Sequence, residues 1–320
     1  MNMRRALGDP RGFYRAGWMA VASVPWFWPA AVAWLLPFGL LEACPAQAAA
    51  DAKADKFVRV QRNDKDVVTA LETAIVSFQG KDAAGTPAGD ATPLTVDLIG
   101  VVHVGDSAYY KKLNALFKKY DAVLYELVAE EGTRIEPGQR RAGGGAIMAM
   151  QGGMKSLLDL SHQLDEIDYR PKNLFHADMS PEEFDKSMKE RGESFQKMFF
   201  RALGRSMVEQ HKPGGPNEVE LLFAFFADDR ALRLKRALAV QFEDLDRAAK
   251  MFAGPDGSTI IEERNKKAFS VLKERIAAGD KKIAIFYGAG HLPHMEQQLD
   301  KDFGLTRAGA QWLTAWDLSK

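Results

Sequence analysis

The sequence predicts an α/β (α+β) fold in which both ends of the chain build a mixed central sheet around a large helical insertion. Apolar, β-branched runs typical of buried strands lie near both ends, at residues 94–103, 122–126, 282–287 and 311–317. Residues from about 140 to 278 carry mainly helical patterns. Gly100–His103 and Gly288–His291 both have the sequence Gly-x-x-His after a strand and before a helix. We therefore expect two strand–Gly-x-x-His–helix units, one from each end of the chain.

The first 48 residues have the three parts of a secretory signal peptide. Four arginines up to Arg15 form a basic head, residues 17–41 contain no charged side chain, and Ala46-Gln47-Ala48 matches a cleavage site. The apolar run is also long enough to span a bilayer, so an uncleaved anchor is the alternative. We expect an exported protein, periplasmic or secreted, that contacts a membrane only through this segment if it is retained.

Charge and cysteine content exclude several functional classes. The 43 Lys and Arg residues balance 43 Asp and Glu residues, whereas nucleic-acid-binding proteins carry a basic excess or patch, so we expect no nucleic-acid partner. The single cysteine, Cys44, lies in the leader, so the mature chain can form neither an internal disulfide nor a cysteine metal site. Any metal must be held by His, Asp or Glu.

After the leader we expect a flexible Lys- and Asp-rich lead-in at 49–66 and then one domain at 67–320. The apolar stretch 67–78 fits either a helix or a strand. The stretch 81–93 is rich in Gly, Ala, Asp, Thr and Pro, which predicts a loop.

Two units of secondary structure follow. Asp106 or Ser107 can cap a helix that runs to about Tyr120. With the strands on either side, this helix makes one βαβ unit, whose connection should be right-handed. Glycine-rich residues between 143 and 153 indicate a lid or a linker, and a helix at 155–164 and a short strand at 173–178 come next.

The rest of the chain is mainly helical until its final strands. Ser180-Pro181-Glu182-Glu183 is a strong helix start, with a capping serine, proline in the first turn and glutamate at the third position. The helical pattern then continues to about residue 278, with breaks near 211–216 and 254–257. A last helix is expected to begin near Pro293.

Four residues able to do chemistry fall at or just beyond the ends of expected strands: His103, Glu126, Asp178 and His291. In open α/β sheets, sites form outside the carboxyl ends of the strands, so these side chains could converge. Two neutral imidazoles and a carboxylate suit a divalent metal, which would activate water or polarise a carbonyl. In the alternative interpretation each histidine is a hydrogen-bonded structural residue, and Glu126 pairs with an arginine such as Arg264.

Other candidate residues and motifs point less clearly to chemistry. His176, Asp178 and His294 have similar positions, and a structural role is the simpler interpretation of each. The stretch Gly288–Pro293 imitates a dinucleotide-binding fingerprint, but a proline replaces its third glycine and too little chain follows for a nucleotide-binding half. The chain contains no G-x-S-x-G, H-E-x-x-H or Walker A sequence.

The order and spacing of four stretches of the chain support a family resemblance: Leu98–Asp106, Leu124–Glu126, Ile261–Asn265 and Tyr287–Pro293. In these stretches the chain resembles the TraB/PrgY/GumN family, which is related to the Tiki-type proteases and more distantly to the erythromycin esterase and ChaN-like proteins. The resemblance spans most of residues 94–317 and implies two sheet-forming halves with a helical insertion. For the Tiki branch it implies metal-dependent proteolysis, whereas other branches inhibit peptide pheromones or have no assigned role.

Carried over by motif, the resemblance implies a site of His103, Glu126 and His291, supported by Arg264 and Asn265. We expect an exported hydrolase that acts on peptide or amide bonds, in a peptide or small-molecule substrate. His103 and His291 would bind a divalent metal, with Glu126 as a further ligand or the general base. Arg264 would stabilise oxyanion charge or pin Glu126, and Asn265 would orient a ligand or substrate. The alternatives are a non-catalytic periplasmic protein that sequesters a peptide or a haem-like ligand, and an inert scaffold.

Overall fold

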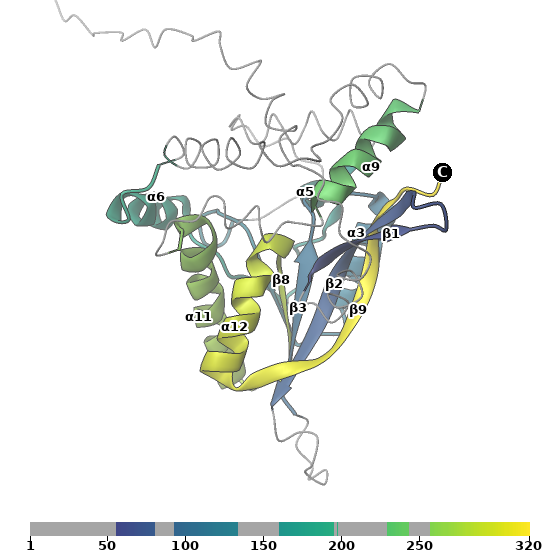
Figure 1. The fold of residues 1–320 in the computed structure, drawn as a ribbon. Helices are drawn as coiled ribbons and strands as arrows, with labels where there is room; N and C mark the ends of the chain where they lie inside the picture. Colours follow the sequence, from purple (N-terminus) through teal and green to yellow (C-terminus); the bar gives the residue numbers. More distant parts are fainter. Residues whose placement is uncertain (1–55, 81–92, 134–159, 195–196, 198–228, 243–256) are drawn as a thin grey trace, which may run out of the picture. The chain divides into compact units, whose positions relative to one another are not determined.

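The computed structural model describes residues 56–80, 93–133, 160–194, 197, 229–242 and 257–320 (Figure 1). These residues belong to one compact unit, which spans residues 38–320. Several predictions lie outside the described residues: the signal peptide at 1–48, the start of the lead-in, most of the loop at 81–93, the glycine-rich segment and the break near 211–216. Within the described ranges, no helix combines the length and the apolar character that crossing a bilayer requires.

The expected α/β fold with a mixed central sheet is confirmed. The described strands of this sheet follow the order β1-β2-β3-β8-β5-β7. β9 lies off this path and pairs with β2 on the side opposite β1 and β3. Their bounds are Val58–Arg62 (β1), Val68–Gly80 (β2), Thr95–Val101 (β3), Ala122–Tyr125 (β5), Leu174–His176 (β7), Lys282–Gly288 (β8) and Leu305–Asp317 (β9). Pairing among β1, β2, β3 and β9 is antiparallel, whereas β3, β8, β5 and β7 are parallel neighbours. β8 thus lies between β3 and β5, the strands of the expected βαβ unit.

Part of the expected flexible lead-in is strand β1, which pairs with β2. Val58 is buried and Val60 packs against the core, and they alternate with Arg59 and Gln61. Both of these polar side chains donate to the Glu72 carboxylate of β2, at 2.7 and 2.9 Å. Charged residues surround the short alternation of apolar and polar residues in β1, so the sequence alone does not predict a strand. The strand is recognisable only from its pairing with β2.

The long strands β2 and β9 form an antiparallel pair at one side of the sheet. β2 resolves the ambiguity at 67–78 in favour of a strand. β9 begins at Leu305, earlier than the expected residue 311. The sequence does not predict this first half of the strand, because it carries exposed residues around Gly309 instead of an alternating apolar pattern.

Helices cover both faces of the sheet. Phe117 of α3 (Ser107–Phe117) packs on Phe286 of β8, with ring centroids 4.8 Å apart. The next residue, Tyr287, points to the opposite face because side chains alternate along a strand, and its ring packs on His291, just before α12 (Leu292–Phe303). α11 (Arg264–Ala277) lies beside α12 (Figure 1).

A second, two-stranded sheet lies beside the end of β3. β4 (Val104–Gly105) pairs with β6 (Ser161–His162), and the short helix α5 (Gln163–Glu166) follows. In the expected helix at 155–164, Ser161 and His162 therefore form a strand instead, whereas Gln163 and Leu164 are helical as part of α5. Backbone pairing with β4 overrides the local helical pattern there.

The two helix starts expected from proline are confirmed. α6 (Pro181–Glu190) begins with a complete capping box between Ser180 and Glu183. α12 carries Pro293 in its first turn and ends at Gly304, which adopts the left-handed conformation that glycine tolerates best. Among the remaining described helices, α9 spans Arg230–Phe242.

Trp316 of β9 supports the segment that carries His103. Trp316 is fully buried, and its Nε1–H donates to the Val104 carbonyl at 2.8 Å. Trp316→Phe should leave this carbonyl without its donor and lower the free energy of unfolding by about 1–3 kcal/mol. Trp316→Ala should lower it by about 3–5 kcal/mol, as measured by urea unfolding.

Trp312 of the same strand is the matched control. Its ring is only partly buried and lies under Arg59, so Trp312→Ala should lower the free energy of unfolding by less than Trp316→Ala does. Equal losses at the two positions would contradict the special role of Trp316.

Candidate functional site

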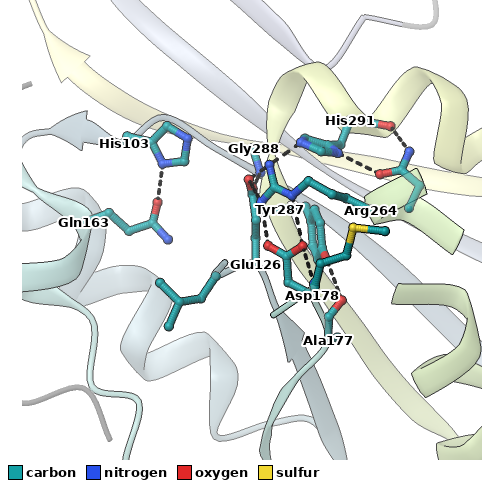
Figure 2. Close-up of polar contacts among 12 residues, drawn as sticks. His103, Glu126, Gln163, Ala177, Asp178, Arg264, Tyr287, Gly288 and His291 are labelled. Atoms are coloured by element: carbon teal, nitrogen blue, oxygen red, sulfur yellow. Dashed lines mark hydrogen bonds and ion pairs between the residues drawn. The ribbon is translucent and has the colours of Figure 1, made fainter. Parts of the chain in front are cut away.

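The two Gly-x-x-His sequences lie close together because their strands are neighbours. β3 and β8 run parallel with Val101 opposite Gly288, so both chains leave the sheet at the same edge. β5 lies on the other side of β8, and Glu126 directly follows it. The carboxyl ends of three adjacent parallel strands thus bring His103, Glu126 and His291 together (Figure 2).

Gly288 is the point around which these side chains meet. Its N–H donates to Glu126 Oε2 at 2.6 Å. A Cβ atom built on this glycine would lie 3.1 Å from Glu126 Oε2, 3.7 Å from His103 Nε2 and 3.7 Å from His291 Cδ2. Even a methyl group here would crowd the Glu126 carboxylate, whereas its distances to the two imidazoles are ordinary contacts, so the carboxylate favours glycine at the end of this strand.

A buried arginine anchors Glu126 from α11. Arg264 Nη2 donates to Glu126 Oε1 at 2.6 Å. The same guanidinium binds Asp178, which follows β7, through Nε at 2.9 Å and through Nη2. All three side chains are buried. One guanidinium between two carboxylates leaves one negative charge uncompensated within this group.

The electrostatics of the group keep Glu126 ionised. Burial alone would raise the pKa of the Glu126 carboxyl, but the charge of Arg264 and the hydrogen bond from the Gly288 N–H help to hold it well below its ordinary value. Burial likewise would lower the pKa of Arg264, and the two carboxylates raise it above its ordinary value. At neutral pH Glu126 can therefore accept hydrogen bonds but cannot donate them.

His291 is held in one tautomer by a buried amide. Its Nδ1 lies 2.7 Å from Asn265 Oδ1, while Asn265 Nδ2 donates to the His291 main-chain oxygen at 3.1 Å. Because an amide oxygen only accepts, Nδ1 carries the proton and Nε2 has a free lone pair. Burial, only partly opposed by Glu126, lowers the pKa of His291 to about 3, so the ring is neutral at pH 7.

His103 is held in the same way from the other side. Its Nδ1 lies 3.0 Å from Oε1 of Gln163, and Gln163 Nε2 donates to Tyr169 OH at 3.0 Å. The Gln163 main-chain N–H also donates to the His103 carbonyl at 2.8 Å. His103 therefore also carries a proton on Nδ1, which makes Nε2 the nitrogen that could bind a metal. Unlike His291, it is exposed to solvent.

The donor chemistry of this site fits a divalent cation. Histidines that bind metals use one ring nitrogen and donate the other N–H to an oxygen behind it, as both rings do here. His291 Nε2 and Glu126 Oε1 lie 3.6 Å apart with a lone pair on each, a contact that a proton or a cation between them would relieve. Within the described ranges, however, no three His, Cys, Asp or Glu side chains are arranged as a ready metal site.

The five residues expected at the site are all in this region, and the sequence reasoning missed two of their partners. The sequence indicates Asp178 only as a residue beyond a strand. It gives no signal for Gln163, whose contact with His103 depends on the pairing of β4 with β6. Two other histidines have structural contacts: His176 Nε2 lies 2.6 Å from the Leu127 carbonyl, and His162 caps α5.

A π-helical turn, η3 (Thr259–Glu263), directly precedes α11. It is attached to α6 and the turn after it, where Arg191 donates to Glu263 at 2.9 Å. Such turns are frequent at functional sites. This one sets the start of α11, from which the consecutive residues Arg264 and Asn265 reach the carboxylates and His291 respectively.

Comparison of the chain with protein-family models, with curated proteins and with solved structures gives no match in any of the three. The resemblance to the TraB/PrgY/GumN family therefore stays a prediction based on motifs.

Removing Arg264 should strongly destabilise the protein. Arg264→Met would leave two buried carboxylates without their cation, and we expect the free energy of unfolding to fall by about 3–5 kcal/mol. The matched control is Arg170→Met, because Arg170 forms an exposed pair with Asp168 whose loss should change stability by at most about 1 kcal/mol. Urea unfolding of both variants measures the difference, and similar losses would contradict the anchoring role of Arg264.

The stability of the metal-free protein should fall as the pH drops below about 6.5. The pKa of His291 is lowered from 6.5 to about 3, so between these values the unfolded chain binds a proton that the folded chain does not. The free energy of unfolding should therefore decrease by up to about 1.4 kcal/mol for each pH unit. In His291→Gln the slope between pH 6.5 and 5 should be smaller, and an equal slope would contradict this assignment.

Proposed function

We propose that this protein is an exported metal-dependent hydrolase that acts on peptide or amide bonds. The observation that carries the proposal is the convergence around Gly288 of an ionised carboxylate and two imidazoles, each with its Nδ1–H held by an amide oxygen and its Nε2 turned away from that amide. The uncompensated negative charge of the buried group favours a cation at this place. In this proposal residues 1–48 direct export, as a cleaved signal peptide or a retained anchor.

The proposal includes the finer architecture that the sequence indicated. Two strand–Gly-x-x-His–helix units would supply one histidine each, and the helical insertion at about 140–278 would separate them along the chain. The adjacent parallel strands β3 and β8 support this view, as does the resemblance to the TraB/PrgY/GumN family in the order of its motifs.

His103 and His291 would hold the cation through Nε2, and Glu126 would approach it through Oε1. A divalent metal in this position supplies an activated water and polarises the substrate carbonyl. The lowered pKa of Glu126 makes it a weak base, since general bases work best with a pKa near the operating pH. We therefore favour Glu126 as a metal ligand over Glu126 as the general base. Solvent reaches the site from the side of His103, which is exposed.

Arg264 and Asn265 would act through other residues. Arg264 is engaged by Glu126 and Asp178, which favours the pinning of Glu126 over the stabilisation of an oxyanion. Asn265 orients His291 rather than a substrate, because it is fully buried and its amide bonds that histidine.

A non-catalytic binding protein is the second candidate. Both Glu126 oxygens already accept hydrogen bonds, from Arg264 and from Gly288. A carboxylate satisfied in this way is less free to bind a metal, which favours a protein that sequesters a peptide or a haem-like ligand without catalysis.

Metal binding tests the proposal directly. We expect the full chain, stripped with a chelator, to bind one zinc or cobalt(II) ion by equilibrium dialysis. His103→Ala and His291→Ala should each weaken this binding by more than roughly 100-fold, beyond the 10- to 100-fold typical of outer-shell partners. His162→Asn, which keeps the capping acceptor of α5, is the matched control and should bind like the wild type.

Activity and haem binding separate the two candidates. Hydrolysis of a quenched fluorescent peptide library should need the metal and stop in both alanine variants. A protein that binds neither zinc nor cobalt(II) would overturn the metal-dependent hydrolase. A Soret band on haem titration, lost in the same variants, would then support the binding protein.

A further inference from the structure

His294 contacts the site through Asn265. It lies in the first turn of α12, half-buried, and its Nδ1 accepts a hydrogen bond from Asn265 Nδ2 at 2.9 Å. The second hydrogen of the same amide goes to the His291 main-chain oxygen. Both N–H groups of Asn265 are therefore used by acceptors of one short segment, residues 291–294.

These two acceptors decide which way the Asn265 amide faces. In the observed orientation Oδ1 points to His291 Nδ1, at 2.7 Å. The reversed orientation would place Oδ1 against the His291 carbonyl, so that two acceptors face each other, and it would require His294 to carry its ring proton on Nδ1 instead. Because Asn265 is fully buried, water cannot compensate, and each unpaired group costs about 1–3 kcal/mol.

The orientation of the amide in turn decides the tautomer of His291. With Oδ1 beside it, Nδ1 must carry the proton, and Nε2 faces Glu126 Oε1 as a lone pair 3.6 Å away. With the amide reversed, Nδ1 would become the acceptor, and the proton would move to Nε2. A protonated Nε2 could donate to Glu126 but could not bind a metal.

We propose that His294 is a positioning residue that fixes, through Asn265, the Nδ1–H tautomer of His291. Its consequence for metal binding rests on the proposed function, but the tautomer itself does not. The main-chain oxygen of His291 is present whatever the side chains are, so His294 supplies the one side-chain acceptor in this arrangement that a substitution can remove.

The test uses nitrogen NMR of the metal-free full chain labelled with ring-¹⁵N histidine. Long-range ¹H–¹⁵N correlation distinguishes the protonated nitrogen of each ring from the one with a lone pair, and His291→Gln identifies the His291 signals. His294→Phe keeps a ring of similar size but has no acceptor. His294→Gln keeps an acceptor that Asn265 Nδ2 can reach.

We expect the wild type and His294→Gln to show His291 protonated on Nδ1, with a lone-pair signal from Nε2. In His294→Phe that Nε2 signal should be lost or shifted towards the protonated position. The affinity for zinc should fall roughly 10- to 100-fold in His294→Phe and stay close to the wild type in His294→Gln.

An unchanged His291 tautomer in folded His294→Phe would overturn the proposal, and so would the same change in His294→Gln. Thermal unfolding of both variants checks that they are folded, since a purely structural role would lower the melting temperature without moving the nitrogen signals. An altered tautomer with unchanged zinc affinity would uphold the positioning role and contradict the metal ligation in the proposed function instead.

Discussion

The contact of Arg264 with Glu126 and Asp178 is the interaction on which the rest of the site depends. It joins the residues after β5 and β7 to the first residue of α11, so three segments far apart in the sequence have fixed positions. It also keeps Glu126 ionised inside the protein, where burial would otherwise favour the neutral acid. Since two carboxylates share one guanidinium, the same contact leaves one negative charge, which would favour a cation beside the histidines.

A second level of organisation acts on hydrogen positions. Gln163 and Asn265 are buried amides, and each accepts from Nδ1 of one site histidine. Each amide is oriented by a further ring, Tyr169 in one case and His294 in the other. Unrelated parts of the chain therefore hold a proton on Nδ1 of each imidazole. Such preparation reduces the reorganisation that binding a metal or a ligand requires.

The strand pattern of the sequence predicted the sheet and the convergence of His103, Glu126 and His291, because the carboxyl ends of parallel strands share one edge. It could not predict Asp178 as the partner of Arg264 or Gln163 as the partner of His103. These contacts depend on tertiary neighbours, and in the second case on β-pairing of a segment with a local helical pattern. β1 escaped notice for a similar reason, since its short alternation is recognisable only beside β2.

The adjacency of β3 and β8 has a consequence for how the molecule assembles. Val101 finds its partner at Gly288, and β2 pairs along its length with the last strand, β9. These are contacts of very large sequence separation, which slow folding because the loop entropy is lost before the contact energy is gained. A nascent chain in which β8 has not yet been synthesised has neither Gly288 nor His291, and its β3 lacks the neighbouring strand on that side. The site is therefore absent from partly synthesised chains and forms together with the completed sheet.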